Sequence, residues 1–375
     1  MYKMMTPGPV MVRENVRAAR SRITGNPDVD PDFYNFYRDT CRLISELLGT
    51  SNETLILGGE GILGIEASCA SLTEPGDRVL VLDNGVFGHG FADFVRIYGG
   101  EPVLYTSDYS RPIDPEALNA FLQKDHSFRY AAVVHCDTPS GVLNDIHTIC
   151  PLLKSYGILT VVDAVASMFA EDISMEADGI DVLCGGSQKV VSAPAGLCFV
   201  TLSQDAKDAI NGRRTPIASF YASLKPFFTY YEDQWFPYTM PISDITGLRE
   251  ALHNLKTDTD VKGRHARIAH AAREALTRAG LSLYLKDGFA STVTVFLVPE
   301  QTTSRQILDR MLQKHDILLN SSFGCFGGKV IRIGHMGENA AVEHMAETMD
   351  ALDETLRFLG VPLKTGLKDA FLSAL

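Results

Sequence analysis

Lys189 and Asp163 are the two residues of this sequence whose types and surroundings most directly suggest chemistry. Lys189 closes a turn of small and polar residues at 185–188, and small residues follow it again at 193–196. Asp163 ends the apolar run 159–162, which predicts a buried strand. A lysine amine can form an imine with a carbonyl cofactor, and a carboxylate can keep a pyridinium nitrogen protonated. The pair therefore predicts a pyridoxal-dependent enzyme.

Each of these two residues also has a plainer interpretation. Most lysines are solvated at the surface, and an aspartate at the end of a strand often caps the helix that follows. The neighbours of Lys189 favour the chemical interpretation, because a lysine confined among small apolar groups has a lowered pKa and is more often a free amine. For Asp163, the carboxyl end of a parallel strand is where ligands bind in open α/β sheets.

Two further segments carry polar groups at the ends of apolar runs. Residues 135–141 (His-Cys-Asp-Thr-Pro-Ser-Gly) are turn formers, but their hydroxyl and amide groups also suit a loop that faces a cofactor ring. Arg332 lies between Ile331 and Ile333, where we expect either a bidentate clamp on a substrate carboxylate or a structural ion pair. The ten histidines show no metal-ligand spacing, so no metal site is expected.

A glycine motif at residues 59–64 (Gly-Glu-Gly-Ile-Leu-Gly) supports a competing hypothesis. It follows a predicted strand and opens a predicted helix, and Asp83 ends the next strand, which together match the fingerprint of a dinucleotide-binding fold. Glu60 argues against it, since its carboxylate would lie where a pyrophosphate binds, at the positive end of a helix. An NAD-dependent oxidoreductase therefore stands as the alternative from another class.

The composition restricts the partners and the compartment. The chain of 375 residues is long enough for two domains, and its net charge of −12 disfavours nucleic acid and anionic membranes as partners. The seven cysteines are scattered, odd in number and without CxxC spacing, which is typical of a reducing compartment. We expect no secretory signal, since residues 1–12 hold no long apolar stretch, and no apolar run approaches the ~20 residues of a membrane span. We expect a cytoplasmic protein.

Apolar runs alternate with helical patterns from about residue 54 onward. Short apolar runs, which predict strands, lie at 54–57, 78–82, 130–136 and 159–163. Helical patterns lie at 62–72, before Gly99, at 114–123 and at 145–156. Near-continuous apolar strands that alternate with helices are typical of a parallel sheet covered on both faces. The predicted fold class is therefore α/β.

The pattern changes past about residue 245. The predicted elements there are two helices at 244–254 and 261–279, a strand at 291–298, a helix at 304–314, a strand ending near Ile333 and a last helix from 338 to about 359. Such a succession is typical of a smaller α+β domain. We expect an N-terminal segment at the active site over 1–15, a large cofactor-binding domain over 16–250 and a small C-terminal domain over 251–375.

Taken together, these segments resemble the class V aminotransferases among the fold-type I enzymes that use pyridoxal phosphate. The likeness runs almost from end to end, through residues 6–9 (Thr-Pro-Gly-Pro), 163–167 (Asp-Ala-Val-Ala-Ser), 187–189 (Ser-Gln-Lys) and 332–334 (Arg-Ile-Gly). Within the family the chain is similar to alanine–glyoxylate and serine–pyruvate aminotransferases. The resemblance implies a large domain with a mostly parallel sheet, a smaller C-terminal domain, and a homodimer whose active sites are shared between subunits.

The resemblance also implies roles for individual residues. Lys189 would form the imine and later move the proton, and Asp163 would pair with the pyridine nitrogen. Phe87 would stack on the ring, and Arg332 would bind the substrate carboxylate. The further residues implied are Pro7 and Gly8 at the substrate, and Glu60, Gly61, Thr138, Val165, Gln188 and Thr239 at the cofactor, the last from the partner subunit.

Two positions depart from the pattern of the alanine–glyoxylate enzymes. Glu60 stands where they have a serine, and Phe236 where they have a tyrosine near Thr239. Both changes remove a phosphate partner, and a carboxylate ~4 Å from a phosphate is strongly unfavourable in a partly buried site. They suggest a branch similar to pyridoxamine–pyruvate aminotransferase, whose substrate is the vitamin without phosphate. That branch has a second arginine, absent from residues 321–324 here, and an asparagine in place of Gln188, so both interpretations stay open.

The main prediction is an aminotransferase that uses pyridoxal 5'-phosphate. It would move an amino group between a small amine, such as alanine or serine, and a 2-oxo acid, pyruvate or glyoxylate, through an imine on Lys189. The alternative within the family uses unphosphorylated pyridoxamine and pyridoxal as substrates. A ligand-binding relative without catalysis is a third hypothesis, which the intact Lys189, Asp163 and Arg332 oppose.

Overall fold

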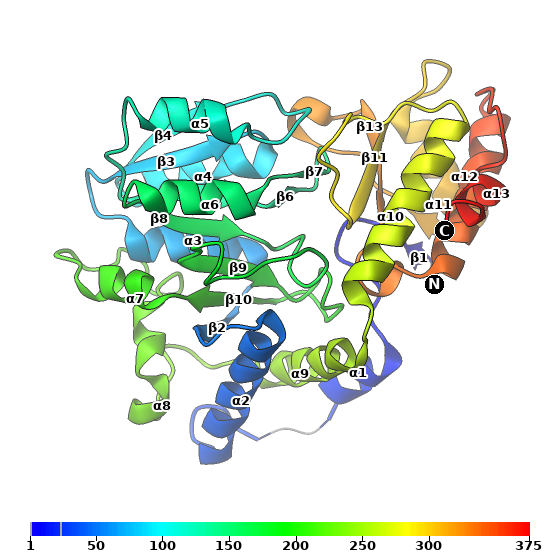
Figure 1. Ribbon diagram of the computed structural model, residues 1–375. Coiled ribbons are helices and arrows are strands. Elements are labelled where there is room, and N and C mark those ends of the chain that lie inside the picture. Colours follow the sequence, from blue (N-terminus) through cyan, green and yellow to red (C-terminus); the bar gives the residue numbers. More distant parts are fainter. Residues whose placement is uncertain (1, 23–24) are drawn as a thin grey trace.

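A seven-stranded sheet forms the centre of the larger part of the protein (Figure 1). The computed structural model describes residues 2–22 and 25–375, so Met1 of the predicted N-terminal segment and residues 23–24 of the predicted large domain lie outside the described residues. In spatial order the strands are β2 (Glu53–Gly58), β10 (Leu197–Leu202), β9 (Val182–Gly186), β8 (Leu159–Asp163), β5 (Tyr130–Val134), β3 (Arg78–Asp83) and β4 (Glu101–Thr106).

The predicted mostly parallel sheet is confirmed, with one exception. β10 runs antiparallel to both of its neighbours, β2 and β9, whereas the other neighbouring strands are parallel. Residues of β5, β9 and β10 are buried along the whole strand, which accounts for their near-continuous apolar sequence. Because β2 and β9 are both antiparallel to β10, they point the same way, and their carboxyl ends lie at one edge of the sheet with that of β8.

Helices cover both faces of the sheet, because right-handed crossovers, the general rule for parallel strands, place helices on opposite faces when the strand order reverses. β3 leads through α4 (Val86–Ile97) to its neighbour β4, and the chain then turns back through α5 (Pro115–Leu122) to β5 and through α6 (Ile146–Ser155) to β8. This reversal places α5 and α6 on one face and α4, with α3 (Gly61–Leu72), on the other. Accordingly, α5 packs on α6 and α3 packs on α4 (Figure 1).

A smaller part of the molecule lies beside one end of the large sheet (Figure 1). Its antiparallel strands are β11 (Val293–Leu297) and β13 (Val330–Gly334). Its helices are α10 (Val261–Arg278), α11 (Ser304–His315), α12 (Val342–Phe358) and α13 (Leu367–Leu372). Their apolar faces form a hydrophobic core separate from that of the large sheet. The division of the chain into units at 15 and 250 stays a prediction.

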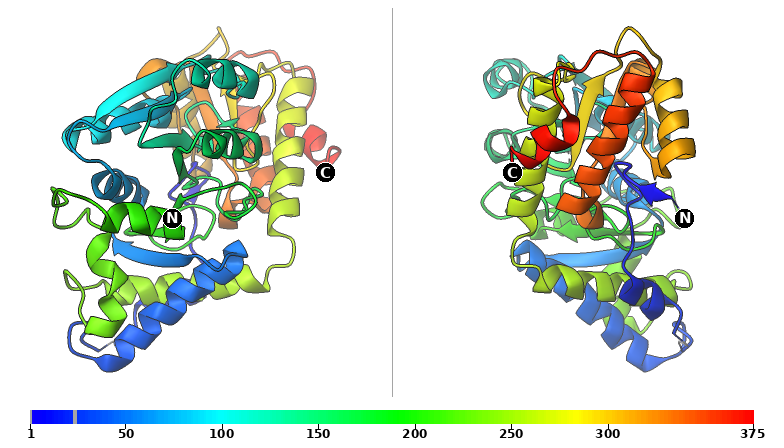
Figure 2. Two further views of the ribbon diagram at one scale, coloured as in Figure 1. Left: turned by 60° about the vertical axis from the view of Figure 1, so that its left-hand side comes forward. Right: turned by 90° about the vertical axis from the view of Figure 1, so that its right-hand side faces the viewer.

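The N-terminal chain connects the two parts. β1 (Lys3–Met4) pairs in parallel with β12 (Ile317–Leu318) on the smaller part. The chain then crosses to α1 (Glu14–Arg20), which packs on α9 (Ile242–Thr257) below the large sheet (Figure 2). The segment between β1 and α1 therefore passes across the junction of the two parts, which is where the candidate site lies.

Two sequence expectations need correction, and several elements were not expected. The run 130–136 is not one strand, because it breaks at His135 into β5 and the short β6 (Cys136–Asp137), which pairs with β7 (Val142–Leu143). The expected last helix is preceded by a short 3-10 turn, starts only at Val342, and is followed by α13. The unexpected helices include α1, α2 (Pro31–Leu48), α7 (Gln204–Asn211) and α8 (Tyr230–Asp233), and the unexpected strands of the large sheet are β4, β9 and β10.

Candidate active site

A pocket of about 180 Å³ opens at the carboxyl edge of the large sheet. It gathers residues that lie far apart in the sequence. The expected site residues that line it are Gly8, Glu60, Gly61, Phe87, Thr138, Asp163, Val165, Gln188 and Lys189. The lining residues that were not expected are Pro9, Ile62, Ile65, Cys136 and Ala166. Four of them, Pro9, Ile62, Cys136 and Ala166, belong to segments that the sequence had marked, although they were not named individually, and Ile65 directly follows the glycine motif.

Lys189 follows β9 and reaches across to the N-terminal segment. Its Nζ donates a hydrogen bond to the carbonyl oxygen of Pro7 at 2.6 Å. Burial lowers the pKa of Lys189 to about 8, against the opposing effect of Cys136 and Asp163. Gly8 has φ +93°, and a Cβ there would lie 2.5 Å from Cδ of Lys189. Glycine at this position therefore lets the backbone pass directly over the lysine.

Asp163 ends β8 inside the same pocket and is only 6% exposed. Its Oδ1 accepts a hydrogen bond from the backbone N–H of Val165 at 2.9 Å, although the segment that follows is a turn and not a helix. Oδ2 accepts no hydrogen bond from any residue that the structure describes. Burial raises the pKa of Asp163 to about 6. One carboxylate oxygen is thus left for a ligand.

Phe87 provides an aromatic wall near the N-terminus of α4. The Phe87 ring meets the ring of Phe323 edge-on, with centroids 5.9 Å apart. The guanidinium carbon of Arg332 lies 5.6 Å from the centroid of the same Phe323 ring. Phe323 therefore connects the aromatic wall to the arginine, a contact that nothing in its sequence surroundings indicates.

Arg332 on β13 is 4% exposed and enters no ion pair among the residues described. Its Nε donates to the carbonyl oxygen of Ser321 at 2.6 Å. Burial lowers the pKa of Arg332 to about 10, and Asp137 raises it. Its charge in turn helps to lower the pKa of Lys189. The arginine thus lies near the pocket without lining it, and the described part of the chain offers it no partner for the structural ion pair that was its alternative interpretation.

Glu60 occupies the N-terminus of α3. Its Oε1 accepts from the backbone N–H of Ile62 at 3.2 Å, and its Oε2 accepts from Nε2 of Gln188 at 3.2 Å. Gln188 Oε1 is buried and has no hydrogen-bond partner. At Gly61 a Cβ would meet the Val165 side chain at 2.7 Å. A carboxylate therefore already holds the positive end of the helix, where an anion would otherwise bind.

The polar segment 135–141 is both a turn and a wall of the pocket. The backbone N–H of Gly141 donates to the carbonyl oxygen of Asp137 at 2.8 Å, which closes the turn. Cys136 and Thr138 line the pocket. His135 is buried and its Nδ1 has no partner, and burial lowers its pKa to about 3. The two interpretations of this segment are thus compatible.

Thr239 lies outside the pocket of its own chain. It is exposed, and its Oγ1 donates to Oδ2 of Asp28 at 2.8 Å. Phe236 is buried in an aromatic cluster, where its ring stacks on that of Tyr34 with centroids 5.2 Å apart.

The surroundings of the glycine motif at 59–64 contradict a dinucleotide-binding fold. In that fold the strand before the motif has parallel neighbours and lies beside the strand that ends in the acidic residue. Here β2 is an edge strand that pairs only with the antiparallel β10, and β3 lies across four intervening strands, β10, β9, β8 and β5. Asp83 instead accepts hydrogen bonds from Thr106 and Tyr109.

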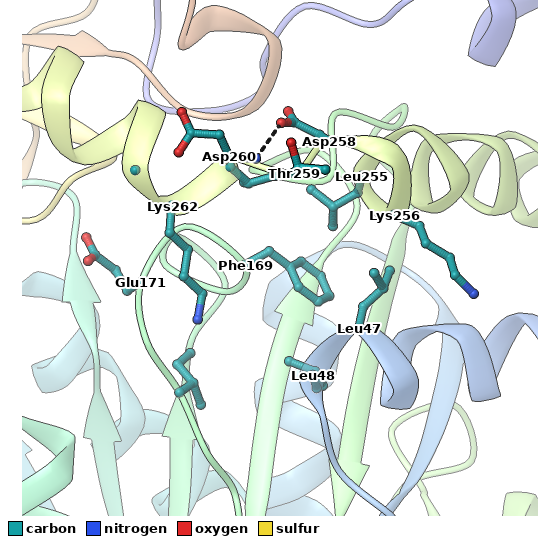
Figure 3. Close-up of a pocket in the computed structure, with 13 residues that line it drawn as sticks. Leu47, Leu48, Phe169, Glu171, Leu255, Lys256, Asp258, Thr259, Asp260 and Lys262 are labelled. Atoms are coloured by element: carbon teal, nitrogen blue, oxygen red, sulfur yellow. Dashed lines mark hydrogen bonds between the residues drawn. The ribbon is translucent and has the colours of Figure 1, made fainter.

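A second cavity, of about 360 Å³, lies between the end of α2 and the connection from α9 to α10 (Figure 3). It shares no lining residue with the Lys189 pocket. Its charged side chains are paired within the chain: Lys256 with Glu46, Lys262 with Asp172, Asp258 with Arg264, Asp260 with Arg267, and Glu171 with Ser291. It therefore offers no free charged group to a ligand.

Over residues 2–22 and 25–375, the structure holds no cluster of three or more His, Cys, Asp or Glu side chains suited to a metal ion. Over the same residues, no helix combines the length and apolar character needed to cross a membrane.

Comparison with known proteins identifies the family. The family model for aminotransferase class-V matches residues 17–340. A pyridoxamine–pyruvate transaminase from Mesorhizobium japonicum is 31% identical over 367 residues, which are 96% of this chain and 93% of that protein. An L-aspartate–glyoxylate aminotransferase from Paracoccus denitrificans is 28% identical over 373 residues, which are 96% of this chain and 92% of that protein.

A solved structure agrees with the sequence comparisons. The crystal structure of a ureidoglycine–glyoxylate aminotransferase from Bacillus subtilis superposes with a TM-score of 0.95 at 27% identity, covering 100% of this chain and 98% of that one. The chain therefore belongs to the class-V aminotransferases, with the α/β fold of the fold-type I enzymes. The predicted family, fold class and transaminase activity are confirmed.

Proposed function

We propose that this aminotransferase holds a pyridoxal ring in the Lys189 pocket. It transfers an amino group from a small amine, such as alanine or serine, to a 2-oxo acid, such as pyruvate or glyoxylate. The observation that carries the proposal is that the amine of Lys189, the free carboxylate oxygen of Asp163 and the ring of Phe87 meet in one small pocket. When bound, pyridoxal supplies a carbonyl that reacts with amines and a protonated ring that accepts electrons.

The pocket suits the ring of this group. Phe87 offers a flat apolar surface, and Val165 and Ala166 add small apolar groups. The unpartnered oxygen of Asp163 can accept a hydrogen bond from a protonated ring nitrogen. At pH 7 and above Asp163 is ionised, since burial raises its pKa only to about 6, and it thus keeps that proton on the ring.

Lys189 is suited to moving a proton. Its pKa of about 8 leaves a useful share of free amine near neutral pH, because burial disfavours the charged form. The Pro7 carbonyl oxygen, 2.6 Å away, holds Nζ in place while the amine accepts a proton from the substrate carbon and returns it. Gly8 leaves the lysine side chain in place, because any Cβ at this position would collide with it.

Arg332 is suited to binding the carboxylate of the substrate. It is buried without a carboxylate partner, so a substrate anion would complete a charge-assisted pair that the protein itself does not supply. Because Arg332 lies on the smaller part and Lys189 on the larger, the substrate would bridge the two parts of the molecule.

Activity with alanine tests this proposal. Protein incubated with alanine and either pyridoxal or pyridoxal phosphate should release pyruvate. Lys189→Ala should lower the rate at least a hundredfold, since general acid–base catalysis contributes roughly 10²–10⁴-fold. Lys124→Ala is the control, because Lys124 is exposed and does not line the pocket. Normal turnover by Lys189→Ala would refute the proposal.

Glu60 favours a second candidate function, in which unphosphorylated pyridoxamine and pyridoxal are substrates. The phosphate arm of the ring would reach the N-terminus of α3, where the Glu60 carboxylate and Gln188 are already hydrogen-bonded to each other. A phosphate there would face a like charge, whereas a hydroxymethyl group can donate to the carboxylate.

Binding of the two ring forms distinguishes the candidates. If Glu60 sets the preference, the protein binds pyridoxal more tightly than pyridoxal phosphate, and Glu60→Ser raises affinity for the phosphorylated form at least tenfold. Glu60→Gln, which keeps the size and removes the charge, should give part of the gain. No gain in either variant would leave pyridoxal phosphate as the resident cofactor.

We further propose a homodimer in the cytoplasm. Three large aromatic side chains, Phe220, Tyr221 and Trp235, are more than half exposed in the segment that carries Thr239. An exposed aromatic group of this kind is typical of an interface. The free state of all seven cysteines in the structure suits a reducing compartment.

A further inference from the structure

The N-terminus of α4, which carries Phe87, lacks a cap of its own. The N-cap residue is Gly85, which has no side chain that could accept a hydrogen bond from the first turn of the helix. In such a helix the N–H groups of the second and third residues need an acceptor from elsewhere. Here these are the N–H groups of Phe87 and Gly88.

Asp137, on β6, supplies that acceptor. Its Oδ2 accepts from the backbone N–H of Phe87 at 3.1 Å, and the N–H of Gly88 also stabilises its charged form and lowers its pKa. A Cβ at Gly85 would fall 1.6 Å from the same Oδ2. The carboxylate thus occupies the volume that a local cap side chain would use, and Gly85 is the residue that makes room for it.

Holding a carboxylate here is costly for stability. Asp137 is fully buried, and its Oδ1 has no hydrogen-bond partner. Burial, aided by the charge of Asp163, raises its pKa to about 7, and the charge of Arg332 opposes this. A buried carboxylate with an unpaired oxygen destabilises a fold, so its benefit must lie in the position that it gives to its neighbours.

We propose that Asp137 is a positioning residue that caps α4 from another strand and thereby fixes the ring of Phe87 over the pocket. The inference rests on the proposed function, because its purpose is to orient Phe87 toward a bound pyridoxal ring. Asp137 does not line the pocket, whereas its neighbours Cys136 and Thr138 do. It therefore acts through Phe87 and not by touching the ligand.

Exchanging the two residues provides the test. Asp137→Gly removes the cap and should weaken pyridoxal binding, measured by absorbance titration, about fivefold to tenfold, the value of one helix cap. Gly85→Asp alone should weaken it as well, because the two carboxylates collide. The double variant, Gly85→Asp with Asp137→Gly, should recover to within about twofold of the wild type, since an aspartate at an extended N-cap (φ −177°) serves the same N–H groups locally.

Several controls keep the result interpretable. Asp137→Asn, close in shape, should weaken binding about twofold to threefold, which guards against misfolding of Asp137→Gly. Asp145→Asn alters the cap of α6, whose carboxylate accepts from Thr148, and should leave binding unchanged. In Phe87→Leu protein, Asp137→Gly should have little further effect on binding.

Amide hydrogen exchange separates this inference from the proposed function. Exchange at Phe87 and Gly88 should be faster in Asp137→Gly and slow again in the double variant, whether or not pyridoxal binds. If the wild type binds no pyridoxal, the proposed function fails while this readout still tests the cap. The inference is overturned if the double variant is as impaired as Asp137→Gly, or if Asp137→Gly binds and exchanges like the wild type.

Discussion

At the scale of single residues, burial acts in opposite directions on the two central side chains. It lowers the pKa of Lys189 to about 8 and raises the pKa of Asp163 to about 6. Between these values a growing share of the lysine is a free amine while the carboxylate is already charged. An amine that can attack a carbonyl and a carboxylate that can hold a ring proton therefore coexist at mildly alkaline pH.

The reaction of Lys189 with pyridoxal should follow this titration. We expect the rate of capture, trapped by borohydride, to rise with pH with a midpoint near 8, because only the free amine reacts. Arg332→Gln should move the midpoint upward, since the arginine charge lowers the pKa of Lys189. A wild-type midpoint near 10.5, the usual value of an exposed lysine, would contradict the buried environment.

Gly8→Ala should block the lysine directly. The added Cβ would lie 2.5 Å from Cδ of Lys189, so the side chain must leave its place, and we expect pyridoxal capture to slow at least tenfold. Gly49→Ala is the matched control, because Gly49 also has a positive φ, of +68°, but has no atom within 4 Å of the added Cβ. Both variants carry backbone strain of roughly 1–2 kcal/mol. Equal capture rates in the two would show that the contact with Lys189 is unimportant.

At the scale of elements, the strands before Glu60 and Asp163 were predicted, whereas β9, which precedes Lys189, was not, and neither was the order of the strands in the sheet. The apolar run before Asp163 and the helix after Glu60 agree with β8 and α3. The antiparallel direction of β10 cannot be predicted from the sequence, because a fully buried strand has the same apolar sequence in either orientation. α2 was not predicted, although Asp30 and Pro31 mark its start, as a cap and a first-turn proline do.

The features of the candidate site that could not be predicted depend on contacts between residues that lie far apart in the sequence. The capping of α4 by Asp137 joins positions 50 apart, and the bond from Lys189 to the Pro7 carbonyl joins positions 182 apart. Every residue has a backbone carbonyl, so the sequence does not show which one will accept a hydrogen bond from a lysine. Phe323 has no motif around it. Lys189 and Asp163 could be proposed from the sequence because both their chemistry and the local pattern around them mark them.

His265 links three elements behind the lysine turn. Its Nδ1 donates to the Val261 carbonyl oxygen at 2.6 Å, and its Nε2 accepts from the backbone N–H of Gly337 at 2.9 Å. The next residue, Glu338, donates its N–H to Oγ of Ser192 in the turn that follows Lys189. α10, the loop after β13 and the lysine turn are thereby held together.

His265→Leu should lower the free energy of unfolding by about 1–3 kcal/mol, because the Gly337 N–H loses its acceptor in a buried place. His270→Leu, exposed on the same helix, should change it by less than about 0.5 kcal/mol.

Burial lowers the pKa of His265 to about 4, so the unfolded chain binds a proton below about 6.5 while the folded one does not. The benefit of His265 is therefore lost as pH falls from 6.5 toward 4. Urea unfolding should show a smaller difference from the wild type at pH 5 than at pH 7.5, and an equal difference would contradict the assignment.

At the scale of the whole molecule, the candidate site depends on both hydrophobic cores. Lys189 and Asp163 extend from the large sheet, whereas Arg332 lies on the smaller part. The N-terminal segment ties them together, since the N–H of Gly334 donates to the Met5 carbonyl oxygen and Pro7 accepts from Lys189. Relative movement of the two parts would change the distance between lysine and arginine, and the segment limits that movement.

The proposed dimer should depend on the exposed aromatic side chains. We expect sedimentation to give twice the chain mass, and Trp235→Glu to shift the protein toward the monomer, because a buried charge opposes association. Phe358→Glu is the control, since Phe358 is also exposed but lies on α12 of the smaller part. A wild-type monomer would contradict the proposal, as would an unaffected dimer in the Trp235 variant.

The most direct test of the central claim is to find which lysine captures pyridoxal. The protein is incubated with pyridoxal or pyridoxal phosphate, reduced with borohydride, digested and analysed by mass spectrometry. A single label on Lys189, absent from Lys189→Ala protein, is the result that the structure predicts. Label spread over exposed lysines, or an undiminished label in the Lys189→Ala variant, would contradict the account.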